Sequence, residues 1–192
     1  APDGTLGYFP WMRSKRWSTD WIGETPVYDS FPILDQVVYD KGAWILHMLR
    51  GRMGDEAFFA LLEDWTSSAR LHGVVDTAMF VALASQHAGE DLAAFFDPWL
   101  HETTVPHLEF ATVVADGTAG AGTRLQVRLR DVSGVAFDNV YPVRVTTEAG
   151  EEWRALRLAG DQTTQDFDFT TAVQSAELDP LGWVAWRAAA AT

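Results

Sequence analysis

The sequence predicts an α + β protein of two domains, a small helical bundle followed by an antiparallel β-sandwich. Three observations lead to this prediction. Apolar residues recur with the period of a helix over residues 37–104, the period changes to two over residues 105–187, and a turn ending in Pro106 separates the two patterns. A length of 192 residues is enough for two domains of this size, each with its own core.

Residues 1–36 precede both patterns, and no regular element is predicted for them. They are rich in Gly, Pro and aromatic side chains without a sustained period, which indicates an irregular segment packed on a larger body. So apolar a segment needs a partner surface, part of which we expect to lie in missing sequence. The chain opens APDGTLGYFPW without an initiator methionine, so we also expect a fragment of a longer protein.

Four helices are predicted between residues 37 and 102, and the first two follow from their caps and apolar spacing. The first covers residues 37–50 and ends at Gly51. The second begins at Asp55, a residue type that caps helix N-termini well. The predicted core positions are Val38, Gly42, Ile45 and Leu49 in the first helix and Phe58, Phe59, Leu62 and Trp65 in the second.

The third and fourth helices lead to the domain boundary. The third starts at the cap Asp76 and stops near Gly89, because glycine readily takes the left-handed conformation that ends a helix. Pro98 lies too deep in the fourth helix for a first-turn proline, so we expect a kink or a restart capped by Asp97. The predicted core positions are Met79, Phe80 and Leu83, then Leu92, Phe95, Phe96, Trp99 and Leu100.

Seven short strands are predicted after Pro106. In one of them Leu125, Val127 and Leu129 alternate with polar side chains, the pattern of a half-buried antiparallel strand. Gly- and Asp-containing turns separate the strands, and this number of short strands is typical of a small β-sandwich. The predicted strands are 108–114, 124–130, 140–146, 152–158, 166–170, 174–178 and 183–186.

Composition narrows the classes of partner. The chain has 14 Lys and Arg against 27 Asp and Glu, a net charge of -13 that repels nucleic-acid phosphates and anionic lipid surfaces. We therefore expect no nucleic-acid partner. No apolar run approaches the roughly 20 residues that cross a bilayer, so no membrane span is expected. The absence of cysteine excludes disulfides and thiolate metal ligands.

Few side chains are placed for chemistry. None of the five histidines has a second histidine four residues along a helix, and His101-Glu102 is separated from His107 by Pro106, so no metal site is predicted in this chain. The loops that bind nucleotides and the Gly-x-Ser-x-Gly nucleophile motif are missing. Tyr39 remains as the candidate catalytic residue. Its alternative interpretation is an ordinary aromatic residue in the first turn of a packed helix.

The helical part resembles the aminopeptidase N family of gluzincin zinc peptidases. The similarity lies in VVYDKGAWILHMLRGRMGDEAFFALLEDW, in the helix that opens at Asp76, and in GEDLAAFFDPWLHETTVPHLEF. Asp40 stands where glutamate is commoner in the family. The closing LDPLGWVAW is similar to the last strands of the sandwich domain that follows in these enzymes. The matching residues are Tyr39, Lys41, Gly42, Met48, Leu49, Gly54, Asp55, Phe58, Gly89, Asp91, Leu92, Phe95, Phe96, Trp99 and Pro106.

The resemblance implies that the helices end a thermolysin-like catalytic domain of a zinc-dependent aminopeptidase that removes N-terminal residues from peptides. In this family zinc polarises the peptide carbonyl, and Tyr39 would donate a hydrogen bond to the oxyanion of the tetrahedral intermediate. The His-Glu-x-x-His motif, the third ligand and the Gly-x-Met-Glu-Asn strand are absent from these 192 residues. We therefore expect zinc in the missing N-terminal part of the catalytic domain, none bound by this chain, and no activity from the chain alone.

Other interpretations stay open. The chain could come from a non-catalytic pseudo-peptidase or scaffold, or be an independent sandwich-bearing adhesion or sugar-binding module. Lys41 and Gly42 are interpreted structurally, the glycine as permitting close helix approach and the lysine as pairing with a carboxylate. The sandwich is interpreted as a spacer that braces the catalytic domain.

Overall fold

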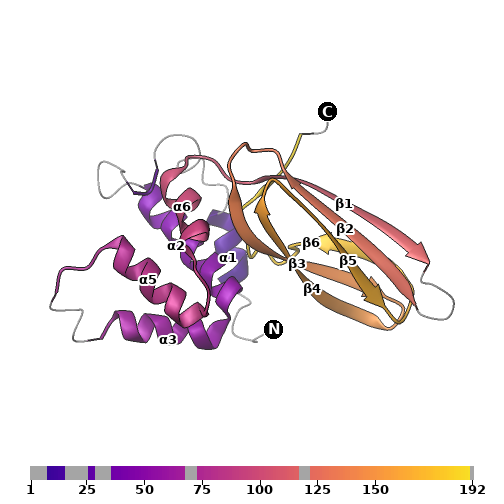
Figure 1. Cartoon of the computed structure of the whole chain (residues 1–192), viewed down its shortest axis with the longest axis horizontal. Coiled ribbons are helices and arrows are strands. Elements are labelled where there is room, and N and C mark those ends of the chain that lie inside the picture. The colour runs from indigo at the N-terminus through magenta and orange to yellow at the C-terminus, as the bar shows by residue number, and fades with distance from the viewer. Residues whose placement is uncertain (1–7, 16–25, 29–35, 68–72, 117–121, 191–192) are drawn as a thin grey trace. The chain divides into compact units, whose positions relative to one another are not determined.

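The computed structural model describes residues 8–15, 26–28, 36–67, 73–116 and 122–190, and within them the protein combines helices with two β-sheets (Figure 1). The prediction of an α + β fold is confirmed at this level. Contacts between Cα atoms divide the chain into two compact units. Unit 1 joins Ala1–Ser18 to Thr104–Thr192, and unit 2 is Thr19–Thr103. The finer division into 1–36, 37–104 and 105–187 stays a prediction.

The described helices belong mostly to unit 2. They are α1 (Tyr8–Lys15), α2 (Gln36–Met53), α3 (Asp55–Trp65), α5 (Thr77–Ala88) and α6 (Ala93–His101). Only α1 falls in unit 1. Across the described ranges, no helix is long and apolar enough to cross a membrane.

Helix α1 is a regular element where the sequence predicted an irregular segment. Pro10 is in its first turn, where the missing N–H had no intrahelical partner to lose. Met12 is buried, and the ring of Phe9 packs edge-to-face on that of Trp183, 4.8 Å away. Phe9 and Trp183 are far apart in the sequence, so the local pattern of residues 1–36 could not reveal this contact. The rest of the predicted irregular segment, except residues 26–28 and 36, lies outside the described residues.

Helix α2 runs beyond its predicted end at Gly51 and stops at Met53. Gly51 is exposed and stays within the helix. Gly54 takes the left-handed φ of 82°, which side-chain-bearing residues avoid, so the chain turns there instead. Val38 and Gly42, both predicted in the core, are half-buried. The buried stripe is Val37, Lys41, Trp44, Ile45, Met48 and Leu49.

Helix α3 starts with Asp55 instead of being capped by it. Gly54 is the cap residue, and the Asp55 carboxylate accepts hydrogen bonds of 2.7 and 3.0 Å from the Arg50 guanidinium. Phe58 is buried as predicted, but Leu61 is its buried partner and Phe59 is 53% exposed. Each residue turns about 100° around a helix, so Phe59 lies away from the face that Phe58 and Leu61 share.

Both predicted ends of helix α5 are confirmed. The Asp76 carboxylate accepts a hydrogen bond from the Met79 backbone N–H at 2.8 Å, and Gly89 ends the helix in the left-handed conformation with φ of 70°. Leu83 is buried as predicted, whereas Phe80 is half-buried. The prediction that Met79 is buried is wrong, because its place in the first turn leaves its side chain exposed.

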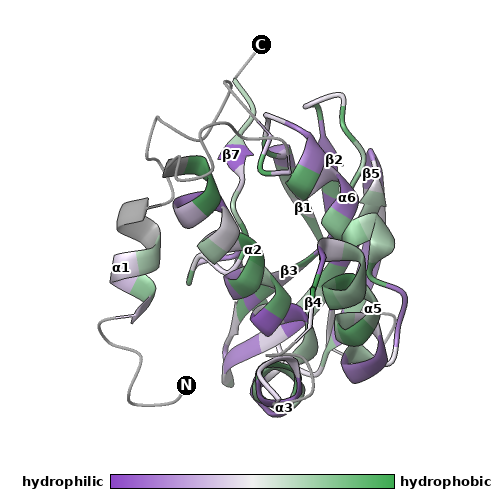
Figure 2. Cartoon of the chain, turned by 90° about the vertical axis from the view of Figure 1, so that its left-hand side faces the viewer, coloured by the Kyte–Doolittle hydropathy of each residue, from purple (hydrophilic) through white to green (hydrophobic). Residues whose placement is uncertain are grey.

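Helix α6 begins after Leu92 and includes Pro98, so of the two predicted alternatives the restart capped by Asp97 is wrong. The alternative, a kink at Pro98, stays a prediction. Proline removes one amide donor from the helix, and burial of the aromatic face compensates for that loss. Figure 2 shows the apolar character of α6 and α5 in green. The buried side chains of α6 are Phe95, Phe96, Pro98 and Trp99.

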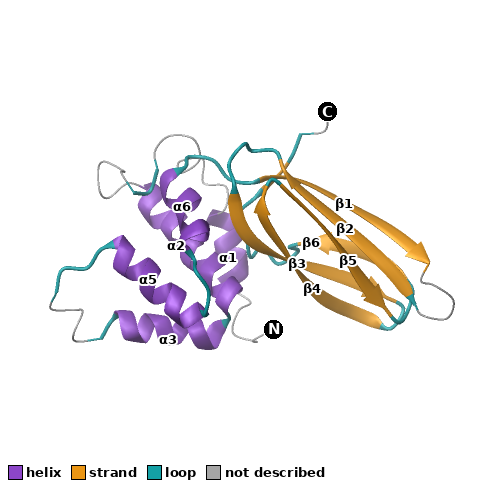
Figure 3. Ribbon diagram, in the orientation of Figure 1, coloured by secondary structure: helices purple, strands orange, loops and turns teal. Residues whose placement is uncertain are grey.

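Unit 1 contains two sheets that lie against each other, visible as orange arrows in Figure 3. One has the order β5-β2-β1-β7 and the other β4-β3-β6. Neighbouring strands are antiparallel except β1 and β7, which are parallel. The strands are β1 (His107–Asp116), β2 (Thr123–Asp131), β3 (Phe137–Thr147), β4 (Gly150–Gly160), β5 (Gln162–Phe169), β6 (Val173–Leu178) and β7 (Arg187–Ala188).

Alternating side chains of the central strands form the core of unit 1. In β2 the buried apolar residues are Leu125, Val127 and Leu129, as the period of two predicted. In β3 Tyr141 and Val143 are fully buried in the same alternating way. Six of the seven predicted strands correspond to observed strands, and the exception is the last.

The last predicted strand, 183–186, is an irregular segment held by Asp179, and β7 comes after it. The Asp179 carboxylate accepts hydrogen bonds from the backbone N–H groups of Trp183 at 2.6 Å and Val184 at 3.0 Å, and from the Trp186 indole N–H at 3.2 Å. The backbone N–H groups of Trp183 and Val184 are therefore not available for hydrogen bonds to a neighbouring strand. Asp179 is buried and has a left-handed φ of 46°, which aspartate tolerates better than most residues.

We predict that Asp179→Ala destabilises the 192-residue chain by about 3 kcal/mol, because buried donors lose a charged acceptor. Alanine also fits the left-handed backbone poorly. Urea unfolding measures the change. The control is Glu148→Ala, at an exposed residue in the turn after β3, which we expect to stay within about 0.5 kcal/mol of the unmodified chain. Equal stability of the Asp179 variant and the control would show that the turn does not depend on this carboxylate.

Candidate active-site helix

Tyr39, the candidate catalytic residue, projects from the first turn of α2 and is 57% exposed. Among the described residues its hydroxyl has no hydrogen-bond partner. The turn is held by its neighbours instead, since Val37, Asp40 and Lys41 are all buried. The 100° step of the helix puts these three residues on the core side and Tyr39 on the outer side. Tyr39 therefore presents a phenol that no described residue engages, on a helix whose other face is buried.

Lys41 is the most unusual of the neighbours, because its side chain is 0% exposed. Its ammonium donates a short hydrogen bond to the backbone carbonyl of Glu102, the residue that follows the last turn of α6. Carbonyls at a helix C-terminus lack intrahelical donors and carry partial negative charge, so a cation suits this position. The sequence predicted a carboxylate partner for this lysine, and the hydrogen bond instead goes to a main-chain oxygen.

Burial lowers the pKa of the Lys41 ammonium from 10.5 to about 8, and the negative charge of Glu102 opposes part of that shift. The cause is the loss of hydration, which the single carbonyl contact replaces only in part. Lys41 thus costs stability while it is charged. It also provides one directional bond between the start of α2 and the end of α6.

The histidines of the described region do not converge on a common point, and no group of three or more His, Asp or Glu suitable for a metal occurs there. His87 lies 3.2 Å from the Asp64 carboxylate, and His101 lies 3.2 Å from that of Asp97. His47 is buried against the ring of Trp44. His72 lies outside the described residues. The described residues therefore do not fit a zinc ion.

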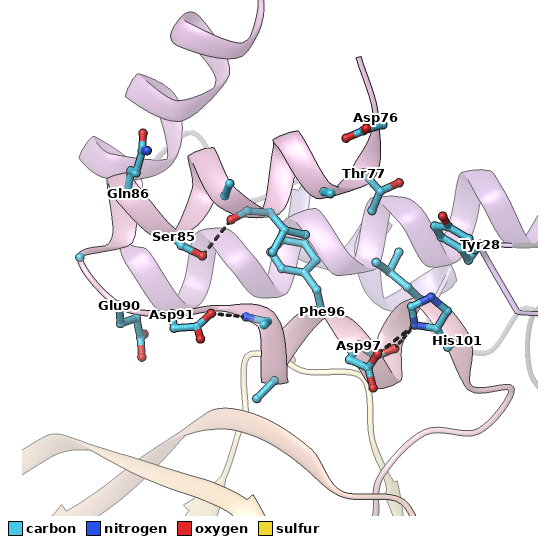
Figure 4. Close-up of a pocket in the computed structure, with 17 residues that line it drawn as sticks. Tyr28, Asp76, Thr77, Ser85, Gln86, Glu90, Asp91, Phe96, Asp97 and His101 are labelled. Carbon is cyan, nitrogen blue, oxygen red and sulfur yellow. Dashed lines mark hydrogen bonds and ion pairs between the residues drawn. The ribbon is translucent and has the colours of Figure 1, made fainter. Parts of the chain in front are cut away.

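Unit 2 also has an open groove of about 1170 Å³ between α5 and α6, and Tyr39 is not among its lining residues (Figure 4). Its floor is apolar, with Val81, Phe96 and Leu100 among small alanines. The hydroxyl of Ser85 is engaged, because it donates to the Val81 carbonyl at 2.8 Å and accepts from the Leu92 N–H at 3.1 Å.

The carboxylates on the rim of the groove are engaged as well. Asp76 and Asp91 accept helix N-terminal amides, Glu90 pairs with Arg52 at 2.8 Å, and Asp97 lies beside His101. Within the described residues the groove thus lacks a nucleophile activated by a base.

Comparisons with known proteins point to aminopeptidases. No protein-family model matches the chain. Over 80 residues the chain is 36% identical to aminopeptidase N of Lactococcus lactis subsp. lactis, a stretch that covers 42% of this chain and 9% of that protein. The crystal structure of Legionella pneumophila aminopeptidase A in complex with aspartic acid superposes on 83% of this chain with a TM-score of 0.66 and 17% identity, covering 18% of its own length.

These similarities do not establish the activity of a complete enzyme for this chain. The sequence match links part of the chain to an aminopeptidase, and the structural match at 17% identity shows a shared fold. The chain spans less than a fifth of the length of either protein. The catalytic role of Tyr39, the zinc dependence and the inactivity of the chain alone remain proposals.

The buried position of Lys41 is the feature of this helix that the sequence analysis missed. Lys41 stands four residues after Val37 and four before Ile45, so it lies on the same helical stripe as these two buried residues. That spacing was readable, but a lysine within an apolar stripe is ordinarily assigned to its edge, because its ammonium prefers water.

We predict a pH dependence of stability that comes from Lys41. Between pH 8 and 10.5 the unfolded chain keeps a proton that the folded chain has lost, so stability rises with pH in this range by as much as about 3 kcal/mol. Below pH 8 the cost of the buried charge is fully present. Urea unfolding of the chain and of Lys41→Met at pH 7 and pH 10 isolates this contribution.

In the methionine variant the contribution of residue 41 is absent, and all other groups are unchanged. The stability difference between the two proteins therefore shifts in favour of the lysine form as the pH rises. A difference that stays constant between pH 7 and pH 10 would contradict the lowered pKa.

Proposed function

We propose that this chain is the C-terminal part of a zinc-dependent aminopeptidase of the aminopeptidase N family, in which Tyr39 stabilises the oxyanion of the tetrahedral intermediate. The observation that carries the proposal is the exposed Tyr39 hydroxyl, without a partner among the described residues, on a helix whose opposite face is buried. The 36% identity to an aminopeptidase N over 80 residues supports it. The substrate would be a peptide with a free N-terminus.

The chemistry proposed for Tyr39 is hydrogen-bond donation. A phenol hydroxyl donates to an oxygen that gains negative charge, and a donor fixed in advance stabilises the transition state more than the ground state. Zinc, when bound, would polarise the scissile carbonyl. The described residues offer no site for it, so its ligands would belong to the part of the catalytic domain that precedes this chain.

The two sheets of unit 1 are proposed to form the β-sandwich domain that follows the catalytic domain in this family. Their central strands bury a continuous apolar face, and the Asp179 turn secures the final segment. Among the described residues, the charges on the exposed face of β2 are neutralised in part by ion pairs such as that of Arg124 with Asp168 at 2.8 Å. Such a module suits a bracing role, without catalytic groups of its own.

We predict that Tyr39→Phe in the full-length parent lowers kcat about 100- to 1,000-fold, equivalent to about 2.7 to 4 kcal/mol of transition-state stabilisation. Phenylalanine keeps the ring and removes only the donor. Because the hydroxyl is proposed to act in the transition state, KM should change little. The measurement is steady-state hydrolysis of an aminoacyl p-nitroanilide by the purified enzyme.

The matched control is Tyr28→Phe, because Tyr28 is also 57% exposed but lies beside the ring of His101, on the α5–α6 groove. This variant should keep the kcat of the unmodified enzyme. Wild-type turnover by Tyr39→Phe, or equal losses from the two substitutions, would remove Tyr39 from catalysis.

A further prediction separates an enzyme from a scaffold. The 192-residue chain alone, supplied with zinc, should hydrolyse no aminoacyl p-nitroanilide, whereas the purified full-length parent should contain about one zinc per chain and be active. Elemental analysis and an activity assay measure the two properties. A full-length parent without zinc and without activity would indicate a pseudo-peptidase or scaffold.

A further inference from the structure

We propose that Lys41 is a positioning residue for Tyr39, because its bond to the Glu102 carbonyl fixes the first turn of α2 against the end of α6. The proposal rests on the function proposed for Tyr39, and it adds a residue that supports catalysis without touching the substrate. It concerns unit 2 alone.

The first turn of a helix needs external support. Its first four backbone N–H groups have no intrahelical partner, and helix ends fray. Tyr39 is the fourth residue of α2, so its position depends on whatever holds this turn. Of the three buried neighbours that hold this turn, Val37 and Lys41 are the most deeply buried, each with 1% or less of its surface exposed. Val37 contributes non-directional packing, whereas Lys41 contributes a directional bond.

The partner of Lys41 is itself firmly held. The Glu102 backbone N–H donates to the Pro98 carbonyl at 3.0 Å, which continues the hydrogen bonding of α6 by one residue. The aromatic residues Phe95 and Trp99 of α6 are almost fully buried. The bond from Lys41 therefore ties the start of α2 to a helix packed in the core, across 61 residues of sequence.

The chemical nature of the side chain matters, because packing alone does not need a lysine here. A methionine would fill a similar volume without the cost of removing an ammonium from water. What lysine adds is a fixed distance and direction to one carbonyl oxygen. A catalytic donor has the same requirement, since it must stand within about 2.7 to 3.1 Å of the developing oxyanion.

Small displacements at this point are costly. A misplacement of about 1 Å caused by a change outside the reacting centre can reduce turnover about 100-fold. Tyr39 lies only two residues before Lys41, so a rotation or translation of the first turn moves the phenol directly. We therefore expect replacement of Lys41 to lower kcat with little change in KM.

The test is a double-mutant cycle in the full-length parent, with Lys41→Met, Tyr39→Phe and the double variant. We expect Lys41→Met to lower kcat about tenfold or more, with KM within about twofold of the unmodified enzyme. In the Tyr39→Phe background the same substitution should cost less than about twofold, because there is no hydroxyl left to misplace.

The matched control is Glu90→Gln, which weakens the ion pair of Arg52 at the opposite end of α2. This variant removes a link of α2 far from Tyr39 and should lower the Tm without lowering kcat. If Lys41→Met does not fold, Lys41→Gln is compared in the same two backgrounds with the same expectations. Its amide is too short to reach the Glu102 carbonyl without movement of the helix.

The outcomes distinguish the two proposals. Two results together support both the catalytic role of Tyr39 and the positioning role of Lys41. Tyr39→Phe lowers kcat, and Lys41→Met lowers kcat in the unmodified enzyme but not in the Tyr39→Phe variant. The positioning role is overturned, and the proposed function stays intact, if Tyr39→Phe lowers kcat but Lys41→Met does not. The same conclusion follows if Lys41→Met lowers kcat equally in the unmodified enzyme and in the Tyr39→Phe variant. Unchanged kcat in Tyr39→Phe overturns both.

Discussion

The helical unit depends on how one cation is accommodated in its core. Lys41 stands in the buried stripe of α2, loses its water, and recovers part of that cost through one carbonyl at the end of α6. This bond ties the start of α2 to the end of α6. The exposed tyrosine two residues earlier takes its orientation from that arrangement. The buried charge of Lys41 lowers the stability of the folded chain, and its bond to Glu102 defines where the start of α2 lies relative to the end of α6.

Unit 1 uses a buried charge in a related way. The Asp179 carboxylate accepts three donors from the segment that follows β6, and it turns that segment away from the sheet before β7 begins. In both units a buried ionisable side chain bonds to main-chain groups: Lys41 to the Glu102 carbonyl, and Asp179 to the N–H groups of Trp183 and Val184. Such bonds define the ends of elements, whereas the apolar stripes define which face of an element is buried.

We propose that the candidate site forms one side of a catalytic centre. It offers a hydrogen-bond donor on a braced helix, and the described residues offer neither metal ligands nor a base beside it. The groove between α5 and α6 has a volume of about 1170 Å³, but its Ser85 hydroxyl and its rim carboxylates are already engaged. Size alone therefore does not identify the place of chemistry here. The similarity to aminopeptidases and the exposed phenol together favour α2.

The sequence alone determined the class of most described elements, because helical and strand periods and the caps Asp76 and Gly89 act within a few residues; α1 and the segment 183–186 are the exceptions. It singled out Tyr39 by its motif, and it identified six of the seven strands. Only the tertiary structure decided that Lys41 is buried, that α2 passes Gly51, that α6 continues through Pro98 and that Asp179 replaces a strand by an irregular segment. The first three depend on a partner distant in sequence or on packing that outweighs local propensity, and a local pattern reports neither. The donors of Asp179 lie only four to seven residues along the chain, but their bonds have no period for a pattern to reveal.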